Sequence, residues 1–299
     1  MSFYLAYGLN VISEILLSEL LVSCPIALNK EDIYIELLEN NKEQLQESSN
    51  FVFFNKEEAS LFVKDTGLFV IKNGNRITVT PHVNVDQKLL AQYLLGPVFG
   101  LLLYQRGYFL LHASTVEINN KAVSFLGASG WGKSTIAAFL CLRGYKLLAD
   151  DVTAIKFENS EPVVIPAFPR IRLGTNTSSF LENKINTPFY FDGEKLSYKT
   201  ENNFSKKPAI LQQAYILENN DSDCIKPLNN QDAVIELIRH SYRVKVIHQV
   251  DPTSHFLRCA NLLEKIKVKK LQKTNDFKKL PKLAEMIEED IYETATCRS

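Results

Sequence analysis

The chain has 299 residues, 45% of them hydrophobic, which is enough for two domains or one large one. Its 34 basic and 34 acidic side chains balance, so we expect no bulk attraction to nucleic acid or to an anionic membrane. The five cysteines form no C-x-x-C pair, which favours reduced thiols in a cytoplasmic protein over a disulfide framework or a zinc site. No signal peptide and no apolar run of about 20 residues is present, so we expect no membrane span.

Residues 1–88 are rich in short apolar runs that are typical of strands. The expected strands are Tyr4–Leu9, Ile33–Leu37, Phe51–Phe54, Ser60–Val63, Gly67–Ile71 and Ile77–Pro81. Between the last two, Asn73-Gly74-Asn75-Arg76 predicts a hairpin. This part of the chain has no cluster of catalytic residue types. We therefore expect a small, mostly antiparallel β-rich domain over residues 1–88 that serves in docking or assembly.

The second domain is expected over residues 89–299. A long helix with an apolar stripe is predicted over Asp86–Gln105, and Pro97 should kink it. Strand residues follow on both sides of His112, and Asn119-Asn120 predicts a turn. His112 is open to two interpretations, a hydrogen-bonded structural group or part of an active site.

Residues 127–134 spell G-x-x-x-x-G-K-S, the pattern of a phosphate-binding loop. An apolar strand, Val123–Leu126, precedes the loop, and a helix is expected over about Lys133–Arg143. Glycines let successive backbone N–H groups turn inward around a polyphosphate, and the helix dipole favours the same anion. We expect the following residues to bind MgATP: Gly127, Ala128, Ser129, Gly130, Trp131, Gly132, Lys133, Ser134 and Thr135.

Two residues of this loop have distinct expected roles. Lys133 brings a positive charge to the β and γ phosphates, and Ser134 offers its hydroxyl to Mg²⁺. The alternative is a plain glycine-rich turn between a strand and a helix. Such a turn has no need of Lys-Ser at this fixed offset, so the nucleotide site is the better interpretation.

Asp150 and Asp151 follow a short predicted strand, Lys146–Ala149, and come 17 positions after Lys133. Carboxylates at the carboxyl end of a strand beside a phosphate loop lie where open α/β sheets bind ligands. A single strand-loop-helix-strand unit would thus carry both the loop and its acidic partners. A solvated turn, or a helix cap at Asp151, is the alternative.

The rest of the chain is predicted mainly from periodicity. Strands are expected over Thr153–Phe157, Val163–Pro166, Arg170–Leu173 and Ala209–Glu218, and helices over Asp232–Tyr242, Thr253–Ile266 and Leu280–Tyr292. The polar stretch 175–203 is expected to be partly a loop over the site, where Lys195 or Lys199 could contact a phosphate or simply be solvated. The lysine-rich stretch Lys265–Lys273 is expected to be a solvated edge strand.

Three stretches together resemble the HPr kinase/phosphorylase family. They are Leu111-His-Ala-Ser, Gly127–Thr135 and Arg143-Gly-Tyr-Lys-Leu-Leu-Ala-Asp-Asp. The chain is more similar still to the family's smaller relatives in peptide biosynthetic clusters, which include the kinases that phosphorylate lasso-peptide precursors. The resemblance implies an α/β fold, with a P-loop kinase domain of HPr kinase C-terminal type behind the β-rich N-terminal domain.

Two departures from HPr kinase itself bear on the substrate. The loop ends in Ser134-Thr135 rather than Ser-Glu, and Pro166–Gly174 stands in place of the family's E-I-R-G-L-G signature. Docking to HPr and the reverse phosphorolysis are therefore not expected.

The resemblance implies an ATP-dependent serine kinase that uses ATP and Mg²⁺. By this resemblance His112, Asp150 and Asp151 line the γ-phosphate, with Asp150 helping Ser134 to hold the metal and Asp151 accepting the proton of the attacking hydroxyl. The expected partner is a precursor peptide or small protein with a Ser or Thr hydroxyl. The alternatives are a nucleotide-binding regulatory module and an HPr-type protein serine kinase. A homo-oligomer also stays open.

Overall fold

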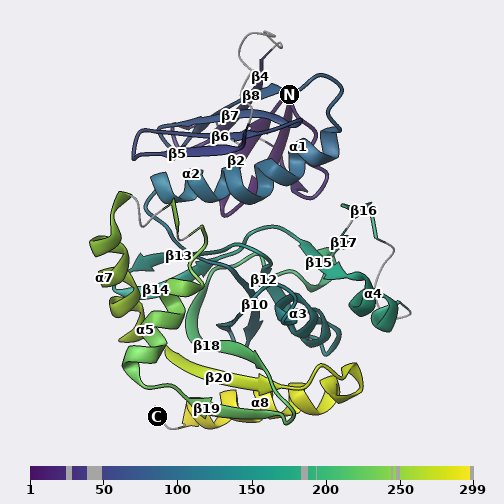
Figure 1. Cartoon of the computed structure of the whole chain (residues 1–299), viewed down its shortest axis with the longest axis vertical. Helices are drawn as coiled ribbons and strands as arrows, with labels where there is room; N and C mark the ends of the chain where they lie inside the picture. The colour runs from purple at the N-terminus through teal and green to yellow at the C-terminus, as the bar shows by residue number, and fades with distance from the viewer. Residues whose placement is uncertain are drawn as a thin grey trace. The chain divides into compact units, whose positions relative to one another are not determined.

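The structure is a computed structural model that describes residues 1–24, 29–38, 49–182, 188–192, 194–243, 245–246 and 250–296, the last three by their backbone alone. The chain divides into two compact units. Unit 1 comprises Met1–Leu110 and Tyr242–His255, and unit 2 comprises Leu111–Ser241 and Phe256–Ser299. Together they form a mixed α/β structure with several sheets (Figure 1). The functional division into residues 1–88 and 89–299 stays a prediction.

Unit 1 contains a mostly antiparallel sheet, as the sequence predicts. Its strands run in the order β3-β1-β2-β4-β8-β7-β6-β5, and β4 pairs in parallel with both β2 and β8. Asn73 and Gly74 at the β7–β8 turn have φ values of 54° and 62°, the left-handed backbone that this pair of residues favours. The strands are β1 (Ser2–Ala6), β2 (Leu9–Ser13), β3 (Leu21–Val22), β4 (Ile33–Leu37), β5 (Phe51–Phe54), β6 (Glu58–Val63), β7 (Gly67–Lys72) and β8 (Arg76–Pro81).

A helical segment follows this sheet within unit 1. It consists of α1 (Gln87–Tyr93), a π-helical turn η2 (Leu94–Val98) and α2 (Phe99–Gln105). The carboxylate of Asp86 caps α1 by accepting a hydrogen bond from the backbone N–H of Lys88. Pro97 has no N–H to donate, and the helix widens into the π turn at that residue. Where the sequence predicts a kink, the structure thus has a π-helical turn that contains Pro97.

Unit 2 is built on a second sheet, in which β12, β10, β11, β18, β14 and β13 follow one another and β20 pairs with β18 and β19. A small separate sheet has the order β15-β17-β16. The strands are β10 (Ala113–Ile118), β11 (Lys121–Leu126), β12 (Lys146–Ala149), β13 (Thr153–Glu158), β14 (Glu161–Ile165), β15 (Arg170–Gly174), β16 (Tyr190–Phe191), β17 (Lys195–Lys199), β18 (Ala209–Asn219), β19 (Cys224–Pro227) and β20 (Lys267–Lys273), with β9 (Phe109–Leu111) preceding β10.

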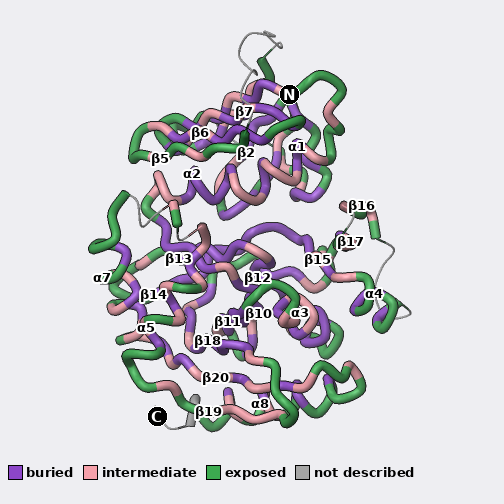
Figure 2. The backbone as a smooth tube through the Cα atoms, in the orientation of Figure 1, coloured by how far each residue is buried: buried purple, intermediate pink, exposed green. Residues whose placement is uncertain are grey.

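Each helix of this part of the chain has buried residues on one side (Figure 2). They are α3 (Lys133–Leu142), α4 (Thr175–Leu181), α5 (Asn230–Arg239), α7 (Pro252–Leu263) and α8 (Leu280–Thr296), with 3-10 turns η3 (Glu201–Asn203) and η4 (Phe277–Lys279). Arg143, at the end of α3, donates to both carboxylate oxygens of Glu288 on α8, at 2.8 and 2.7 Å. Such a two-point contact fixes the relative orientation of the two helices.

One sequence-based expectation is wrong here. The stretch 175–203, expected to be partly a loop, contains α4, β16 and β17 with short connections between them; positions 183–187 and 193 lie outside the described residues. The lysine-rich strand β20 is not an edge strand, since it lies between β18 and β19. Its lysines tolerate this position because neighbouring carboxylates pair with them: Lys269 lies 2.6 Å from Asp290, and Lys270 lies 3.1 Å from Glu218.

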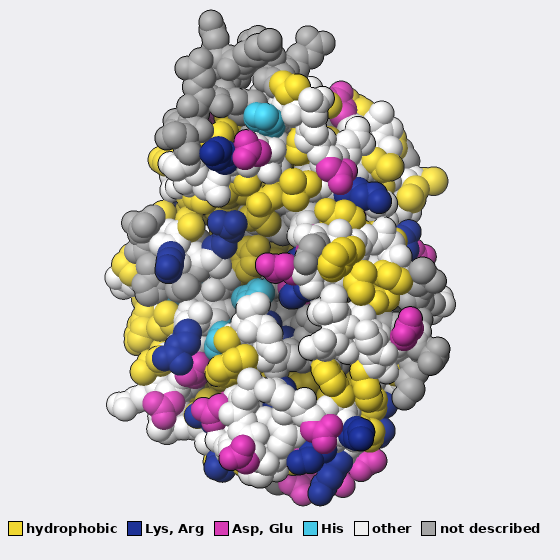
Figure 3. All heavy atoms as spheres, turned by 45° about the vertical axis from the view of Figure 1, so that its right-hand side comes forward, with side chains coloured by type: hydrophobic (Ala, Val, Ile, Leu, Met, Phe, Trp, Pro, Cys, Tyr) yellow, Lys and Arg dark blue, Asp and Glu magenta, His cyan; other side chains and the backbone are white. Residues whose placement is uncertain are grey.

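The surface carries mixed charge. Acidic and basic side chains are interspersed on the face of the described chain that Figure 3 shows. No helix within the described ranges has the length and apolar composition that crossing a membrane would require.

Asp290 joins α8 to two neighbouring strands of the unit 2 sheet, β18 and β20. Its carboxylate accepts hydrogen bonds from Gln213 and Tyr215 on β18, at 2.6 and 2.7 Å, and pairs with Lys269 on β20 at 2.6 Å. Burial, and secondly the hydrogen bond to Asp290, raise the pKa of the Tyr215 hydroxyl and keep it a donor. One carboxylate thus satisfies three partly buried polar groups.

We predict that Asp290→Ala lowers the free energy of unfolding by about 2 kcal/mol, because it leaves charged and polar partners unsatisfied. Urea denaturation followed by circular dichroism measures the change. Asp221→Ala, an exposed position of the same unit, is the control and should change stability little. Equal stability of the two variants would contradict the role given to Asp290.

Candidate functional site

The site forms at one edge of the unit 2 sheet, where several strands end. β18 is parallel to both β11 and β20. β10 is antiparallel to both β11 and β12, so β12 runs in the same direction as β11. The loop after β11 and the carboxylates after β12 therefore meet at the carboxyl edge of the strands, which is where open α/β sheets bind ligands.

The loop between β11 and α3 has the backbone of an anion-binding turn. Gly127, Gly130 and Gly132 have φ values of 153°, 81° and 91°, which L side chains rarely adopt. Lys133 is buried, and its ammonium donates to the carbonyl oxygens of Gly127 and Ala128 at 2.9 and 3.2 Å. Burial lowers the pKa of Lys133, more than the neighbouring carboxylates raise it. The charge is thus held inside the loop, where a polyphosphate would lie.

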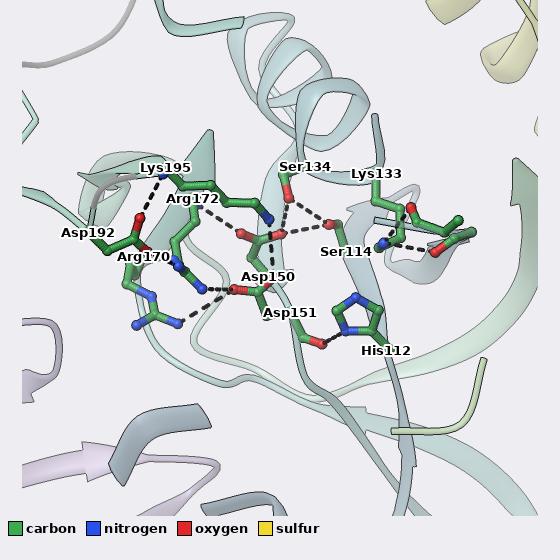
Figure 4. Close-up of polar contacts among 12 residues, drawn as sticks. His112, Ser114, Lys133, Ser134, Asp150, Asp151, Arg170, Arg172, Asp192 and Lys195 are labelled. Carbon is green, nitrogen blue, oxygen red and sulfur yellow. Dashed lines mark hydrogen bonds and ion pairs between the residues drawn. The ribbon is translucent and has the colours of Figure 1, made fainter. Parts of the chain in front are cut away.

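Asp150 is a buried carboxylate with donors from three other elements (Figure 4). Its Oδ1 accepts hydrogen bonds from the hydroxyls of Ser114 and Ser134, at 2.6 and 2.8 Å. Its Oδ2 accepts from the backbone N–H of Arg172 at 2.8 Å. Burial, and secondly the charge of Asp151, raise its pKa. The sequence prediction placed Ser134 and Asp150 together, and they are in direct contact.

The Ser134 hydroxyl and the Asp150 carboxylate are hard oxygen donors that suit Mg²⁺. Magnesium in nucleotide sites is held by one or two protein oxygens together with substrate phosphates. No cluster of three or more His, Cys, Asp or Glu side chains that could hold a metal occurs among the described residues. A metal here would therefore depend on the nucleotide for much of its coordination, and this pair of residues fits that role.

Asp151 has a left-handed backbone, with φ of 68°, and its carboxylate is surrounded by cations. Arg172 lies 3.3 Å away, and Arg170 and Lys195 each lie 3.9 Å away (Figure 4). Burial alone would raise its pKa, but Lys195, Arg172 and Arg170 outweigh burial and lower it. Asp151 is therefore held as a carboxylate. β13 follows it directly, so it does not cap a helix.

His112 contacts the backbone of Asp151 and not its carboxylate. The ring Nδ1 lies 3.0 Å from the carbonyl oxygen of Asp151, and the backbone N–H of His112 donates to the carbonyl of His240 at 2.8 Å. Burial and the nearby charge of Lys133 lower the pKa of His112, so the neutral ring is favoured. A neutral imidazole that donates from Nδ1 would fix the left-handed turn at Asp151.

A cavity of about 450 Å³ opens beside the loop. Residues of the first turn of α3 form its floor, including Lys133, Ser134 and Thr135, and Arg172 and Lys195 line it as well. The sequence left Lys195 open between a phosphate contact and a solvated residue; the structure places it at the cavity and beside Asp151. Lys199 instead lies on the surface, 3.6 Å from Glu201.

Several residues of the site had no sequence signal of their own. Ser114 lies in the stretch that resembles HPr kinase, but its contact with Asp150 was not predicted. Arg172 and Asp192 form an ion pair that sequence analysis did not find, because β15 and the residues before β17 pair only in the folded chain. Arg172 and Asp192 both lie in polar or alternating stretches of sequence that contain no motif.

Comparison with known proteins adds little to this geometry. No protein-family model matches the sequence. A search of curated proteins finds no match either. Among solved structures, the chain is similar to the Hpr(Ser) kinase/phosphatase from Coxiella burnetii, with 13% identity and a TM-score of 0.35, over 62% of this chain and 98% of that one. The identity and the TM-score are too low for this similarity to indicate an activity.

We predict that Asp151 contributes to stability at neutral pH and that this contribution is lost in acid. Its pKa is lowered to about 2 by the neighbouring cations, whereas an aspartate of an unfolded chain titrates near about 3.9. The unfolded chain therefore binds the proton first, and stability falls as the pH drops from about 4 towards 2.

Asp151→Asn should be less stable than the wild type at pH 6, and the difference should shrink as the pH falls through this window. Urea denaturation at a series of pH values measures it, with the exposed Asp221→Asn as control. A difference that does not change with pH would show that Asp151 is not held ionised by Lys195 and the two arginines.

Proposed function

We propose that unit 2 is an ATP-dependent kinase that transfers the γ-phosphate to a serine-type hydroxyl of a precursor peptide. The observation that carries the proposal is the contact between Ser134 of the phosphate loop and the buried Asp150, 2.8 Å apart, with a second carboxylate on the next residue. In a nucleotide-binding site, the Asp150 carboxylate would hold the metal. In phosphoryl transfer to a hydroxyl, the Asp151 carboxylate would accept the proton of that hydroxyl.

Phosphoryl transfer needs positioning and charge neutralisation more than covalent chemistry. In the proposed complex, backbone N–H groups of the loop and the Lys133 ammonium bind the β and γ phosphates. Ser134 and Asp150 hold Mg²⁺, which when bound would neutralise the charge of the phosphates. Arg172 and Lys195, at the wall of the cavity, are further cations that a phosphate could reach.

Asp151 is the proposed acceptor of the hydroxyl proton. A hydroxyl loses its proton mainly as charge develops in the transition state, so the acceptor must be ionised and close. The cations around Asp151 keep it ionised at neutral pH. When a phosphate draws Arg172 and Lys195 towards itself, the pKa of Asp151 rises and the carboxylate becomes a better base.

The preference for a peptide rests on the resemblance between Leu111–Ser114, Gly127–Thr135 and Arg143–Asp151 and the HPr-kinase-like peptide kinases. An HPr-type protein substrate is second, because Pro166–Gly174 stands where the HPr kinase signature would be. The cytoplasmic location, the partners and the docking role of residues 1–88 are part of the same proposal.

The alternative is a regulatory module that binds nucleotide without transferring phosphate. It would use Lys133, Ser134 and Asp150 in the same way. What favours a kinase is the second carboxylate, since binding a nucleotide with its metal needs only Asp150, whereas transfer to a hydroxyl also needs a proton acceptor.

We predict that Lys133→Ala weakens MgATP binding by about tenfold or more, since ~1.4 kcal/mol corresponds to a factor of ten. Trp131, the one tryptophan of the chain, lies inside the loop, so its fluorescence reports binding directly. Lys199→Ala, a surface lysine, is the matched control. Equal MgATP affinity in folded Lys133→Ala and in the wild type would exclude the loop as the nucleotide site.

We predict that Asp150→Asn and Asp151→Asn each reduce phosphate transfer by about 100-fold or more, the usual size of an acid–base or metal contribution. Only Asp150→Asn should also raise the Mg²⁺ concentration that binding of ATP requires. The assay is mass spectrometry of Ser- and Thr-bearing peptides encoded beside this chain, after incubation with ATP. ATP hydrolysis with no peptide modified would support the regulatory module instead.

A further inference from the structure

Lys273 is a buried cation beside the phosphate loop that no motif accounts for. It is the last residue of β20 and is 7% exposed. A Cβ built on Gly132 would lie 3.3 Å from its Cε and 3.5 Å from its Nζ, so its ammonium lies directly over the last glycine of the loop. Lys133 instead donates to the carbonyls of Gly127 and Ala128.

The hydrogen-bond partners of Lys273 are all neutral. Its Nζ lies 3.1 Å from the side-chain oxygen of Asn275, and 3.4 Å from both the Asn219 side chain and the Thr274 carbonyl. No carboxylate of the described residues lies within ion-pair distance of its Nζ. Burial lowers the pKa of Lys273, more than the charge of Asp223 raises it. A buried charge is costly unless an opposite charge compensates it. Lys273 is therefore suited to binding an anion that enters beside the loop.

Lys273 belongs to the wall of the cavity that opens beside the loop. The volume of this cavity, about 450 Å³, falls in the range of about 300–1,000 Å³ that small-molecule sites have. One wall comes from the start of α4 and the other from the segment after β20. The lining residues of this second wall are Lys273, Thr274, Asn275, Asp276, Phe277, Lys279, Leu280 and Leu283.

The two walls are held in place on the loop side and on the outer side. Thr135 on α3 hydrogen-bonds Thr177 on α4 at 2.9 Å. Farther out, the ring of Phe277 stacks on Phe180 of α4, with centroids 5.3 Å apart and planes 20° apart. The cavity lining thus combines cations beside the loop with the aromatic ring of Phe277 and its apolar neighbours, and it also contains the carboxylates of Glu194, Asp223 and Asp276. A ligand with phosphates and a flat ring matches the cations and the aromatic ring.

We propose that this cavity is the nucleoside subsite, in which Lys273 binds the nucleotide phosphates and Phe277 packs against the base. The inference rests on the proposed function, since it takes a nucleotide to be the ligand. Aromatic side chains bind every base by its flat face, so Phe277 would provide affinity for the base without selecting adenine over guanine. The parallel pairing of β18 and β20 is what brings this segment beside the loop.

The experiment compares MgADP with magnesium pyrophosphate, which carries the same two phosphates and no nucleoside. Binding to the full chain is followed by Trp131 fluorescence. Lys273→Ala should weaken both ligands by about tenfold or more. Phe277→Ala should weaken MgADP by about tenfold and leave pyrophosphate unchanged. Lys199→Ala is the control for a lost surface lysine.

The outcomes separate this inference from the proposed function. A wild type that binds neither ligand would contradict the function itself. If the wild type binds both ligands, and Lys273→Ala and Phe277→Ala bind them with unchanged affinity, only the proposed nucleoside subsite is overturned. If Phe277→Ala does not fold, the wild type still decides: equal affinity for MgADP and pyrophosphate would contradict a nucleoside subsite, and a clear preference for MgADP would support it.

Discussion

The site depends on one buried carboxylate, that of Asp150. A buried carboxylate must receive hydrogen bonds, and this one receives them from Ser114 on β10, Ser134 on α3 and the backbone of Arg172 on β15. Because Asp150 directly follows β12, a single carboxylate ties the sheet, the loop helix and the small sheet together. The geometry of the loop and the geometry of the cavity wall are therefore not independent of each other.

The next residue, Asp151, is surrounded by three cations and accepts a hydrogen bond from one of them, Arg172. Arg170, Arg172 and Lys195 would repel one another if Asp151 did not lie between them. The carboxylate thus makes it possible to gather cations at the cavity before any phosphate arrives. Pre-arranged charges of this kind need little rearrangement when a ligand binds, which is where electrostatic catalysis gains most. The same arrangement keeps Asp151 ionised.

The parts of the fold that the sequence predicts well are those set by local pattern. β12, α3, the hairpin at Asn73 and the interruption at Pro97 each depend on a few consecutive residues. The placement of Lys195 and Lys273 depends instead on pairing between distant strands, which no local pattern encodes. Lysine-rich β20 has the composition of a solvated edge, and only its pairing with β18 and β19 shows that its last lysine is buried. Of the candidate site, sequence thus predicts the loop and the aspartates, but not the surrounding cations.

The left-handed backbone at Asp151 limits how this site can change in evolution. At φ of 68°, glycine, asparagine and aspartate are the residues that fit without strain. A single nucleotide change converts an aspartate codon to an asparagine codon, which keeps the turn and removes the charge. Under the proposed function, loss of activity without loss of fold would therefore lie within one mutational step, and the residue at this position would distinguish active homologues from inactive ones.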